Sequence, residues 1–424
     1  MDKLRIIGGN TLHGTVRIDG AKNAALPILA ASILAESRST IRNVPPLSDV
    51  YAMLAILESL GAVYTFDTDK KIVSIDTSGI KNNVAPYDMV RKMRASICLL
   101  GPLLARFGDT KVSMPGGCVI GQRPVDLHIK GLSCLNVSIN IEHGYIVAQS
   151  ACLKGGKVFL GGRFGSSVLA TANVMLAAVK ARGITRIECA ACEPEIVDLA
   201  QCLNAMGAKI SNAGSHTIII EGVDRFNGVD YTIIPDRIEA GTYMIAGAVT
   251  RSKIMLENAN ADHLMGIIDP LMQSGVSISA GANTIEVDAR HDKFQSVDIT
   301  TLPYPGFPTD LQAQMMAFMT TVSGISIITE KIFPERFMHI AELNRMAASV
   351  SLESATAIVK GGLPLSGAPV MASDLRASAA LVIAALRAQG MTEVHRIYHL
   401  ERGYYKMEEK LKLLGANIEK LSDN

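Results

Sequence analysis

The chain has 424 residues, with 41 Lys plus Arg against 40 Asp plus Glu and a net charge of +1 at pH 7. This length predicts two or three domains and a large buried core. The balanced charge argues against a nucleic-acid-binding or membrane-surface protein, because such proteins normally carry an excess of basic residues.

The first residues, MDKLRIIGGN, carry charge at once and precede no long apolar run, so we expect no secretory signal. Seven cysteines are an odd number, which favours free thiols in a reducing cytoplasm over a disulfide framework. The longest uncharged stretch, 311–329, approaches the length of a membrane span but contains several Gln, Thr and Ser residues. There we expect a buried helix followed by a buried strand.

A helix end that runs into a strand recurs six times along the chain. The turn between them falls at Gly61, Asn136, Gly207, Gly275, Ala347 and Gly415, with separations of 75, 71, 68, 72 and 68 residues. A helix often ends in a left-handed backbone angle, which Gly adopts readily, Asn can adopt and Ala adopts less readily. The pattern indicates six units of similar length that cover the whole chain.

A helix almost free of charge also recurs six times, at 23–35, 95–105, 167–179, 240–250, 311–321 and 377–386. A helix that is apolar all round is expected to be buried on all sides. The other helix of each unit is amphipathic, as at 49–60 and 404–414, and short alternating strands such as 39–44 and 217–221 complete the unit. We therefore predict an α/β fold of six βαβ-type units in two pseudo-threefold domains, which join near 231–235.

Polar residues gather where these apolar helices begin: Lys22, Asn23, Arg94, Ser166, Ser167, Arg237, Glu239, Asp310, Asp374 and Arg376. Helix N-termini attract anions, so two domains that face each other with these ends would form a phosphate-seeking cleft. Taken singly, each residue is more often a cap or a solvated charge, although caps favour Ser, Thr, Asp and Asn over Lys and Arg. Asp310 fits a cap, and it equally fits a general base.

The segment 111–128, KVSMPGGCVIGQRPVDLH, places the thiol of Cys118 and the guanidinium of Arg123 on what we expect to be an exposed, flexible loop. A thiol beside a permanent cation is a candidate acid or nucleophile. A surface hairpin with a bystander cysteine is an equal alternative.

Two further signals are weaker. Cys189 and Cys192 have the C-x-x-C spacing, but the chain has no second pair and no His at zinc-finger distance, so packing thiols are favoured over a metal site. The stretch 161–167, GGRFGSS, resembles a phosphate-cradling loop. It lacks the Gly-Lys-Ser/Thr ending of a P-loop and therefore predicts no NTPase.

Nine stretches together carry a more specific signal: GAKNAALP (20–27), RKMRAS (91–96), PGGC (115–118), RPVDLH (123–128), EPEIVD (193–198), PDRIE (235–239), FPTDLQAQ (307–314), DLRA (374–377) and RGY (402–404). With them the chain resembles the UDP-N-acetylglucosamine 1-carboxyvinyltransferases, a family of enolpyruvyl transferases, along essentially its full length. The sister family, the enolpyruvylshikimate phosphate synthases, shares the fold but lacks the PGGC loop.

The resemblance implies a two-domain inside-out α/β barrel whose first strands pair with the C-terminal domain. One domain would be 22–234, with the catalytic loop 111–128, and the other would combine 1–21 with 235–424. Two pseudo-threefold domains of βαβ-type repeats agree with the six units counted above.

The resemblance also implies a reaction. The 3-hydroxyl of UDP-N-acetylglucosamine would add to C2 of phosphoenolpyruvate, and phosphate would then leave, which begins peptidoglycan synthesis in the cytoplasm. Cys118 matches the general acid that protonates C3, with a covalent adduct as a further role, and Asp310 matches the base. Lys22, Arg123 and Arg402 would neutralise phosphoenolpyruvate, and closing of the interdomain cleft would assemble the site and expel water.

For the nucleotide sugar, the matching contacts are Asn23, Arg94, Arg123, Pro124, Val125, Asp126, Leu127, Gly165, Ser166, Ser167, Val168, Asp310 and Ile332. Arg376, with Asp374, would support closure. The resemblance implies no metal, no cofactor, no nucleic acid and no membrane, and a monomer or a weak homo-oligomer.

The sequence departs from the family around 165–168, where Gly-Ser-Ser-Val stands in place of a basic or polar residue followed by Ser-Val-Gly-Ala-Thr. Arg163 is a candidate replacement for the missing cation. This difference leaves two alternatives open: a non-catalytic paralogue that binds a nucleotide sugar, or an enolpyruvyl transferase for another acceptor alcohol.

Overall fold

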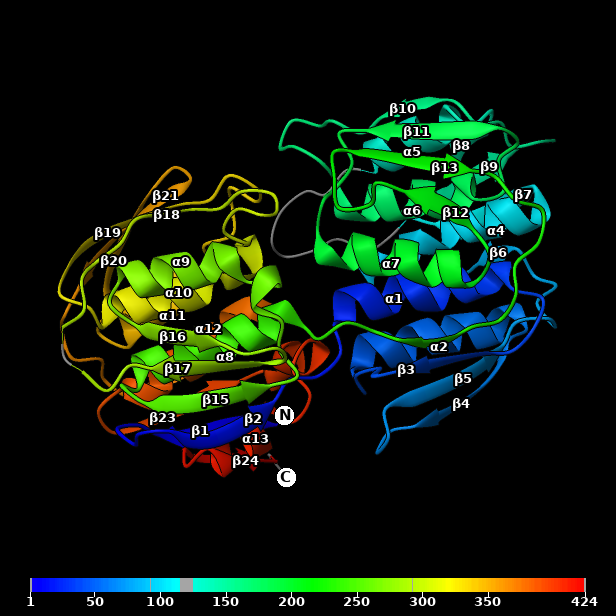
Figure 1. Ribbon diagram of the computed structural model, residues 1–424. Coiled ribbons are helices and arrows are strands. Elements are labelled where there is room, and N and C mark those ends of the chain that lie inside the picture. Colours follow the sequence, from blue (N-terminus) through cyan, green and yellow to red (C-terminus); the bar gives the residue numbers. More distant parts are fainter. Residues whose placement is uncertain (1, 92, 115–124, 292, 423–424) are drawn as a thin grey trace. The chain divides into compact units, whose positions relative to one another are not determined.

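The computed structural model describes residues 2–91, 93–114, 125–291 and 293–422. These residues form two compact units, one of 2–19 and 235–422 and the other of 20–114 and 125–234. Each unit has helices enclosed by sheets (Figure 1). Within the described ranges, no helix is both long enough and apolar enough to cross a membrane.

The unit of 20–234 contains three four-stranded sheets with one common order. The sheets are β14 (Asp230–Thr232), β3 (Ser39–Arg42), β5 (Ile72–Asp76), β4 (Val63–Asp67); β6 (Val84–Ala85), β7 (Asp109–Ser113), β9 (Tyr145–Gln149), β8 (Ser138–Glu142); and β10 (Lys157–Phe159), β11 (Ile184–Glu188), β13 (Thr217–Glu221), β12 (Lys209–Ser211). In each sheet the first pair is parallel and the other two pairs are antiparallel. Three copies of one pairing pattern therefore surround the core of this unit.

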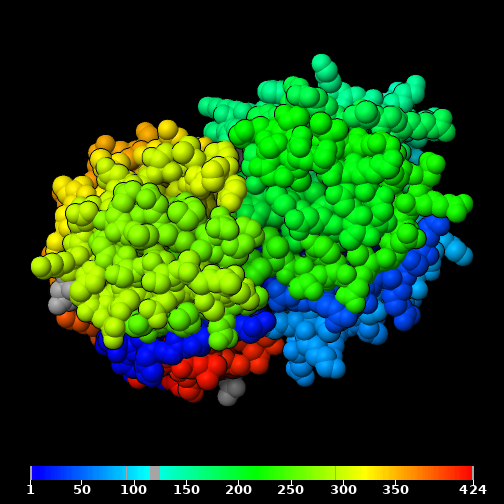
Figure 2. Space-filling view, viewed as in Figure 1, coloured from blue at the N-terminus to red at the C-terminus, as the bar shows by residue number. Residues whose placement is uncertain are grey.

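The other unit repeats the same pattern. Its sheets are β2 (His13–Arg17), β15 (Lys253–Glu257), β17 (Thr284–Asp288), β16 (Ser277–Ala280); β18 (Ile299–Thr300), β19 (Gly324–Thr329), β21 (Thr356–Gly361), β20 (Ser349–Glu353); and β22 (Pro369–Met371), β23 (Met391–His395), β1 (Lys3–Ile7), β24 (Asn417–Leu421). Strand β1 pairs with β23 and β24, with Leu4 opposite both Val394 and Lys420. Figure 2 accordingly shows the blue N-terminal segment beside the red C-terminal one.

One helix of each repeat is almost fully buried, as the sequence predicted. These helices are α1 (Lys22–Ala31), α4 (Leu100–Phe107), α6 (Val168–Ala178), α8 (Arg237–Val249), α10 (Gln312–Thr320) and α12 (Leu375–Arg387). Short 3-10 turns extend three of them, η1 (Ser32–Leu34), η2 (Arg94–Leu99) and η4 (Thr309–Leu311). All nine residues of α10 are buried, so Gln312 and Gln314 place polar amides in the core.

The second helix of each repeat is α2 (Ser48–Leu60), α5 (Asp126–Ser133), α7 (Pro194–Ala205), α9 (Met265–Gln273), α11 (His339–Arg345) or α13 (Met407–Leu413). The short helices α3 (Tyr87–Val90), η3 (Ala261–His263) and η5 (Ile397–Arg402) lie in connections. The prediction of a helix over 404–414 was wrong at its start. Lys406 takes a left-handed angle, φ 49°, so α13 begins only after it.

All six predicted turn positions have a positive φ. The angle is 113° at Gly61, 64° at Asn136, 113° at Gly207, 108° at Gly275, 66° at Ala347 and 99° at Gly415. The repeat prediction is thereby confirmed residue by residue, including at Ala347, where an alanine side chain makes this angle costly.

Two local expectations were wrong. Strand β19 is not buried on both faces, because Ile325 and Ile327 are 58% and 43% exposed while Ser326 and Ile328 point inward. The segment 111–128 is not a loop at its ends, because Lys111 belongs to β7 and Asp126 begins α5. Residues 115–124, and with them Cys118, Arg123 and Pro124, lie outside the described residues.

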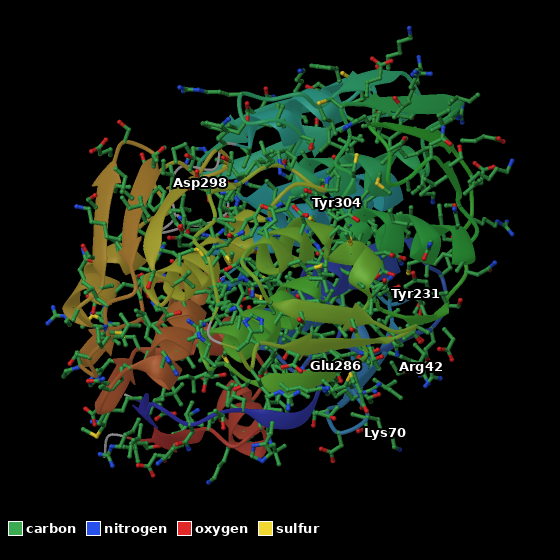
Figure 3. All side chains as sticks on the ribbon, turned by 60° about the vertical axis from the view of Figure 1, so that its left-hand side comes forward. Arg42, Lys70, Tyr231, Glu286, Asp298 and Tyr304 are labelled. Carbon is green, nitrogen blue, oxygen red and sulfur yellow. The ribbon has the colours of Figure 1, made fainter. Side chains whose placement is uncertain are left out.

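Within the described residues, the chain passes from one unit to the other at 19–20 and at 234–235. Just before the second passage, Tyr231 on β14 lies on the strand beside Arg42 of β3 (Figure 3). The Tyr231 hydroxyl donates a 2.6 Å hydrogen bond to Asp198 of α7, and the backbone N–H of Ile234 donates to the other carboxylate oxygen at 3.3 Å. Asp198 thus anchors residues 231–234, the last residues of this unit before the chain enters the other.

Candidate functional site

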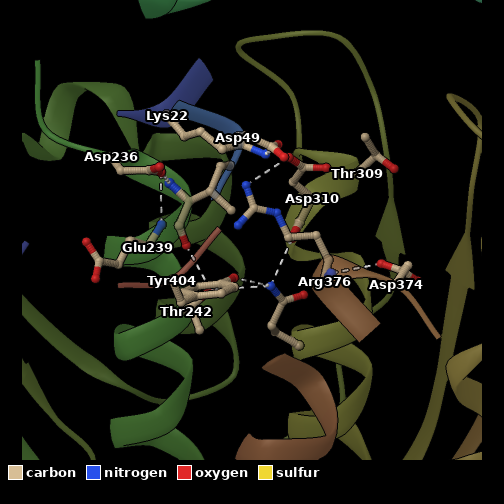
Figure 4. Close-up of polar contacts among 12 residues, drawn as sticks. Lys22, Asp49, Asp236, Glu239, Thr242, Thr309, Asp310, Asp374, Arg376 and Tyr404 are labelled. Carbon is tan, nitrogen blue, oxygen red and sulfur yellow. Dashed lines mark hydrogen bonds and ion pairs between the residues drawn. The ribbon is translucent and has the colours of Figure 1, made fainter. Parts of the chain in front are cut away.

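Asp310, the expected base, lies in η4 and is held by two guanidinium groups, of which Figure 4 shows that of Arg376. Arg336 donates to its Oδ1 at 2.7 Å and Arg376 donates to its Oδ2 at 3.2 Å. The two arginine side chains are 7% and 2% exposed, whereas the Asp310 side chain is 26% exposed. The paired cations stabilise the ionised carboxylate, which is the form that a base requires.

The interpretation of Asp310 as a helix cap was wrong. Neither η4 nor α10 has a capping side chain, because the residues at their N-cap positions are Pro308 and Leu311. Asp374 does cap α12, since its carboxylate accepts hydrogen bonds from the backbone N–H of Arg376 at 2.8 Å and of Ala377 at 3.1 Å. The cap position thus brings Arg376 to the start of α12, from where its side chain reaches Asp310.

A buried carboxylate, Glu330, fixes the surroundings of Asp310. It accepts hydrogen bonds from the Thr309 hydroxyl at 2.9 Å and from the backbone N–H groups of Ile332 and Phe333 at 2.8 and 2.9 Å. The same Thr309 hydroxyl accepts from Arg336 at 3.0 Å. Ile332, one of the expected nucleotide-sugar contacts, is therefore tied to the turn that carries Asp310.

Arg402 is the last residue of η5 and is half-buried. The pKa of His399, three residues earlier, is lowered mainly by burial and secondly by the positive charge of Arg402. Two residues after Arg402, the ring of Tyr404 lies 5.2 Å from the guanidinium carbon of Arg376. The RGY motif therefore contributes the cation Arg402, and its buried Tyr404 packs against a second cation, Arg376.

In the unit of 20–234, Lys22 begins α1 and is buried, and its Nζ lies 3.1 Å from Oδ2 of Asp49 in α2. A buried ammonium group needs such a partner, because an isolated charge is costly to remove from water. Asn23, the next residue of α1, is half-buried.

Arg94 opens η2 and is half-buried, and its charge acts on the buried His128 of α5. Burial, with a smaller contribution from Arg94, lowers the pKa of His128 to about 3. Asn173 Nδ2 lies 3.0 Å from His128 Nδ1, so that nitrogen accepts and Nε2 carries the proton. His128 is therefore neutral at pH 7, and the positive charge here comes from Arg94.

The 162–165 hairpin, part of the stretch whose sequence resembles a phosphate-cradling loop, is closed by two backbone hydrogen bonds between Gly162 and Gly165, of 2.9 and 3.2 Å. Gly165 has φ +94°, and an exposed Arg163 lies at the tip with its guanidinium carbon 5.4 Å from the Phe164 ring. A Cβ on Gly162 would lie 2.9 Å from Leu127 Cδ1. Two of the segments expected to bind the nucleotide sugar therefore touch.

The remaining expected contacts lie on either side of this pair. Val125 is buried, Asp126 is the exposed first residue of α5, and Ser166 and Val168 are half-buried. Ser167 caps α6 by accepting from the backbone N–H of Ala170 at 3.3 Å, so its hydroxyl already has a structural role.

Comparison with known proteins identifies the family. A sequence model described as EPSP synthase (3-phosphoshikimate 1-carboxyvinyltransferase) matches residues 6–411. The UDP-N-acetylglucosamine 1-carboxyvinyltransferase of Methylacidiphilum infernorum (isolate V4) is 53% identical over 418 residues, which cover 99% of this chain and 98% of that protein. The chain belongs to this family of enolpyruvyl transferases.

A protein of the same name from Desulfosudis oleivorans is 50% identical over 422 residues, which cover 100% of this chain and 100% of that protein. Among solved structures, the enolpyruvyl transferase NikO from Streptomyces tendae superposes with a TM-score of 0.90 at 24% identity, over 100% of this chain and 99% of that one. An EPSP synthase from Acinetobacter baumannii gives 0.76 at 18% identity, over 100% of both chains. At these identities the two structures show the fold, and they confirm the predicted two-domain α/β architecture.

For a member of this family, the sequence interpretation missed three side chains that contact expected site residues: Arg336, Glu330 and Asp49. Each becomes a partner only through the tertiary fold, for example Arg336 at 26 residues from Asp310. No motif quoted for the resemblance contains them. The only available sign was a polar segment, EKIFPER at 330–336, directly after an apolar strand.

The fold also adds a neighbour to the C-x-x-C pair. Cys192 Sγ lies 3.5 Å from Nδ1 of His216, which comes from the connection before β13. Among the described residues there is nevertheless no group of three or more His, Cys, Asp or Glu placed to hold a metal ion. The six described cysteines are free thiols, and Cys192 is buried.

Proposed function

We propose that the protein transfers the enolpyruvyl group of phosphoenolpyruvate to the 3-hydroxyl of UDP-N-acetylglucosamine with release of phosphate. Relatives of that name match the chain at about half identity over nearly its full length. The observation that carries the proposal is the partly exposed carboxylate of Asp310, fixed by two buried guanidinium groups. Such a reaction supplies peptidoglycan precursors, and we place it in the cytoplasm.

In the addition step, Asp310 takes the proton of the 3-hydroxyl while that oxygen bonds to C2 of phosphoenolpyruvate. Cys118 delivers a proton to C3, so the carbon–carbon double bond is consumed and no net charge is lost. In the elimination step, the Cys118 thiolate takes a proton back from C3, the double bond forms again, and the C2–O bond to phosphate breaks as the proton held by Asp310 passes to the leaving phosphate. One acid and one base thus account for both proton transfers of the addition.

Phosphoenolpyruvate brings phosphate and carboxylate charges, which we assign to Lys22, Arg123 and Arg402. The pairing of Lys22 with Asp49 supports this role, because it keeps a buried ammonium group in a fixed position. The two domains of the proposed enzyme are 22–234, with the catalytic loop 111–128, and 1–21 with 235–424. We further propose a monomer or a weak homo-oligomer, which sedimentation of the purified protein can check.

The nucleotide sugar is assigned to Asn23, Arg94, the segment from Arg123 to Leu127, the segment from Gly165 to Val168, and Ile332. The contact between Leu127 and Gly162 supports this assignment, because it brings the end of the first segment beside the hairpin that leads into the second. Arg94 supplies a half-buried positive charge beside them, as a diphosphate requires.

Phosphate release from purified protein with both substrates tests the proposal. We expect Asp310→Asn to lower kcat by ~100-fold or more, because a base contributes about 10²–10⁴-fold. The control is Asp288→Asn, which changes a carboxylate of the same unit that pairs with the exposed Arg290. It should leave kcat unchanged. Wild-type turnover by a folded Asp310→Asn protein would overturn the assignment of the base.

Cys118 is tested separately with an epoxide reagent such as fosfomycin. Cys118→Ser should abolish both labelling and most of the turnover, and labelling that persists at another cysteine would contradict the role of Cys118. Unchanged affinity for UDP-N-acetylglucosamine without turnover by the wild-type protein would instead favour a non-catalytic binding paralogue. Phosphate release with a different acceptor alone would favour the other alternative, which the altered residues at 165–168 suggest.

A further inference from the structure

Gln314 is a polar residue in the first turn of the buried helix α10, and it connects the turn of Asp310 to the rest of the core. The side chain is fully buried in α10. Its Nε2 has two hydrogens and three acceptors within reach: the backbone carbonyl of Asp310 at 2.9 Å, Tyr404 Oη at 3.2 Å and Thr242 Oγ1 at 3.3 Å, so one N–H is shared between two acceptors (Figure 4). A buried amide is costly unless it is hydrogen-bonded, so an apolar side chain would serve packing better.

In the hydrogen bonds that link Gln314, Tyr404 and Thr242, the donor and the acceptor of each bond can be assigned. The Thr242 hydroxyl donates to the carbonyl of Ile238 at 2.8 Å within α8, which uses its only proton. Tyr404 must therefore donate to Thr242 across their 2.8 Å contact, and Tyr404 Oη can then only accept from Gln314. Burial raises the pKa of Tyr404, so its hydroxyl keeps this proton at neutral pH. The chain runs from Gln314 through Tyr404 and Thr242 to Ile238.

Tyr404 also supports the side chain that grips Asp310. The guanidinium carbon of Arg376 lies 5.2 Å from the Tyr404 ring centroid, and Arg376 donates to Asp310 Oδ2. Asp310 is thus held at its main chain by Gln314 and at its carboxylate by Arg376. Both of these residues contact Tyr404.

We propose that Tyr404, Gln314 and Thr242 are positioning residues that fix the orientation of Asp310 for the proton transfer. The inference rests on the proposed role of Asp310 as the base. Loss of the Tyr404 hydroxyl leaves Gln314 with fewer acceptors and allows the Asp310 turn to shift. A displacement of ~1 Å costs up to about 100-fold in rate, so the effect belongs in kcat rather than in substrate affinity.

The test is Tyr404→Phe, which removes one oxygen and keeps the ring under Arg376. We expect kcat to fall ~10- to 100-fold, with the KM for UDP-N-acetylglucosamine within about 2-fold of wild type and a shifted acidic limb of the pH profile of kcat. The matched control is Tyr243→Phe. Tyr243 is the residue after Thr242, it is fully buried, and its hydroxyl makes no hydrogen bond within the described residues. It should retain wild-type kcat.

Thr242 provides a second, independent variant. Thr242→Val removes the acceptor and should behave like Tyr404→Phe, whereas Thr242→Ser keeps the hydroxyl and should restore kcat. Circular dichroism and thermal unfolding check that each protein is folded. If Tyr404→Phe and Thr242→Val both match Tyr243→Phe in kcat, the inference is wrong.

A double-mutant comparison separates this inference from the assignment of the base. In an Asp310→Asn protein, Tyr404→Phe should cause no further loss of the residual rate, because the group to be positioned is gone. If Asp310→Asn is inactive while Tyr404→Phe has full activity, only the positioning role fails. If Asp310→Asn keeps full activity, the proposed base itself fails.

Discussion

Arg336 donates a 2.7 Å hydrogen bond to Asp310 from a side chain that is itself almost completely buried. The guanidinium lies on the inner side of the carboxylate and also donates to Thr309. Asp310 is therefore oriented from within the core, while part of its side chain remains accessible to a substrate hydroxyl. This relation decides how the site should respond to substitution.

Arg336→Met should lower kcat by ~100-fold, because the base loses the partner that fixes Oδ1. Arg336→Lys retains the charge but not the planar fork, so we expect a smaller loss of ~10-fold. Removal of the partner should also cost about 1–3 kcal/mol of unfolding free energy. Steady-state phosphate release and urea unfolding measure the two effects.

The control for this prediction is Arg290→Met, which removes an exposed arginine paired with Asp288 in the same unit. It should change neither quantity measurably. Equal kcat values for Arg336→Met and Arg290→Met would show that Arg336 does not orient the base.

Asp198 predicts a pH dependence of stability in the unit of 20–234. Burial raises its pKa to about 6, although the hydrogen bond from Tyr231 opposes the rise. Because the folded state binds this proton more tightly than the unfolded chain does, the contribution to stability is complete below about pH 4. It is lost as the pH rises to about 6, by at most ~3 kcal/mol.

Asp198→Asn should remove this slope from urea midpoints measured between pH 4 and 7. Tyr231→Phe should extend the slope above pH 6, because the hydrogen bond that restrains the pKa of Asp198 is gone. Asp88→Asn, an exposed carboxyl variant of the same unit, serves as the reference. Parallel curves for Asp198→Asn and the reference protein would refute the prediction.

The repeat and the buried helices could be predicted from the sequence, because both depend on local patterns: the turn residues and the apolar runs. The six turn positions share the need for a positive φ, and even Ala347 occupies one. The pairing of Asp310 with two arginines could not be predicted, because Arg336 and Arg376 meet it only after three elements fold together. The same limit explains the error over capping: FPTD has the composition of a cap, but its carboxylate is drawn to two distant arginines.

His128 predicts acid sensitivity of the opposite sign. Burial, followed by the charge of Arg94, lowers its pKa from 6.5 to about 3, so the folded protein excludes a proton that the unfolded chain accepts. The stabilisation is present above about pH 6.5 and is lost as the pH falls toward 3, by several kcal/mol at most. His128→Gln should flatten the fall of the urea midpoint between pH 6.5 and 4.

The reference for this change is His216→Gln, because His216 is exposed and belongs to the same unit. It should keep the wild-type loss of stability in acid. A His128→Gln protein that loses stability in acid as steeply as His216→Gln would mean that His128 is not the group that excludes the proton.

The turn glycines allow backbone strain to be separated from steric overlap. Gly61 and Gly207 both have φ 113°, but a Cβ would meet the Gly79 carbonyl oxygen at 2.7 Å in the first case and nothing nearer than 3.7 Å in the second. Gly207→Ala should therefore cost only the backbone strain, about 1–2 kcal/mol, and Gly61→Ala should cost distinctly more. Ala347→Gly relieves the same strain at φ 66° and should stabilise the protein by about 0.5–1 kcal/mol. Urea midpoints of the three variants provide the test: equal losses for both glycine replacements would show that the chain at Gly79 moves aside, and a loss for Ala347→Gly would show that the alanine angle is not strained.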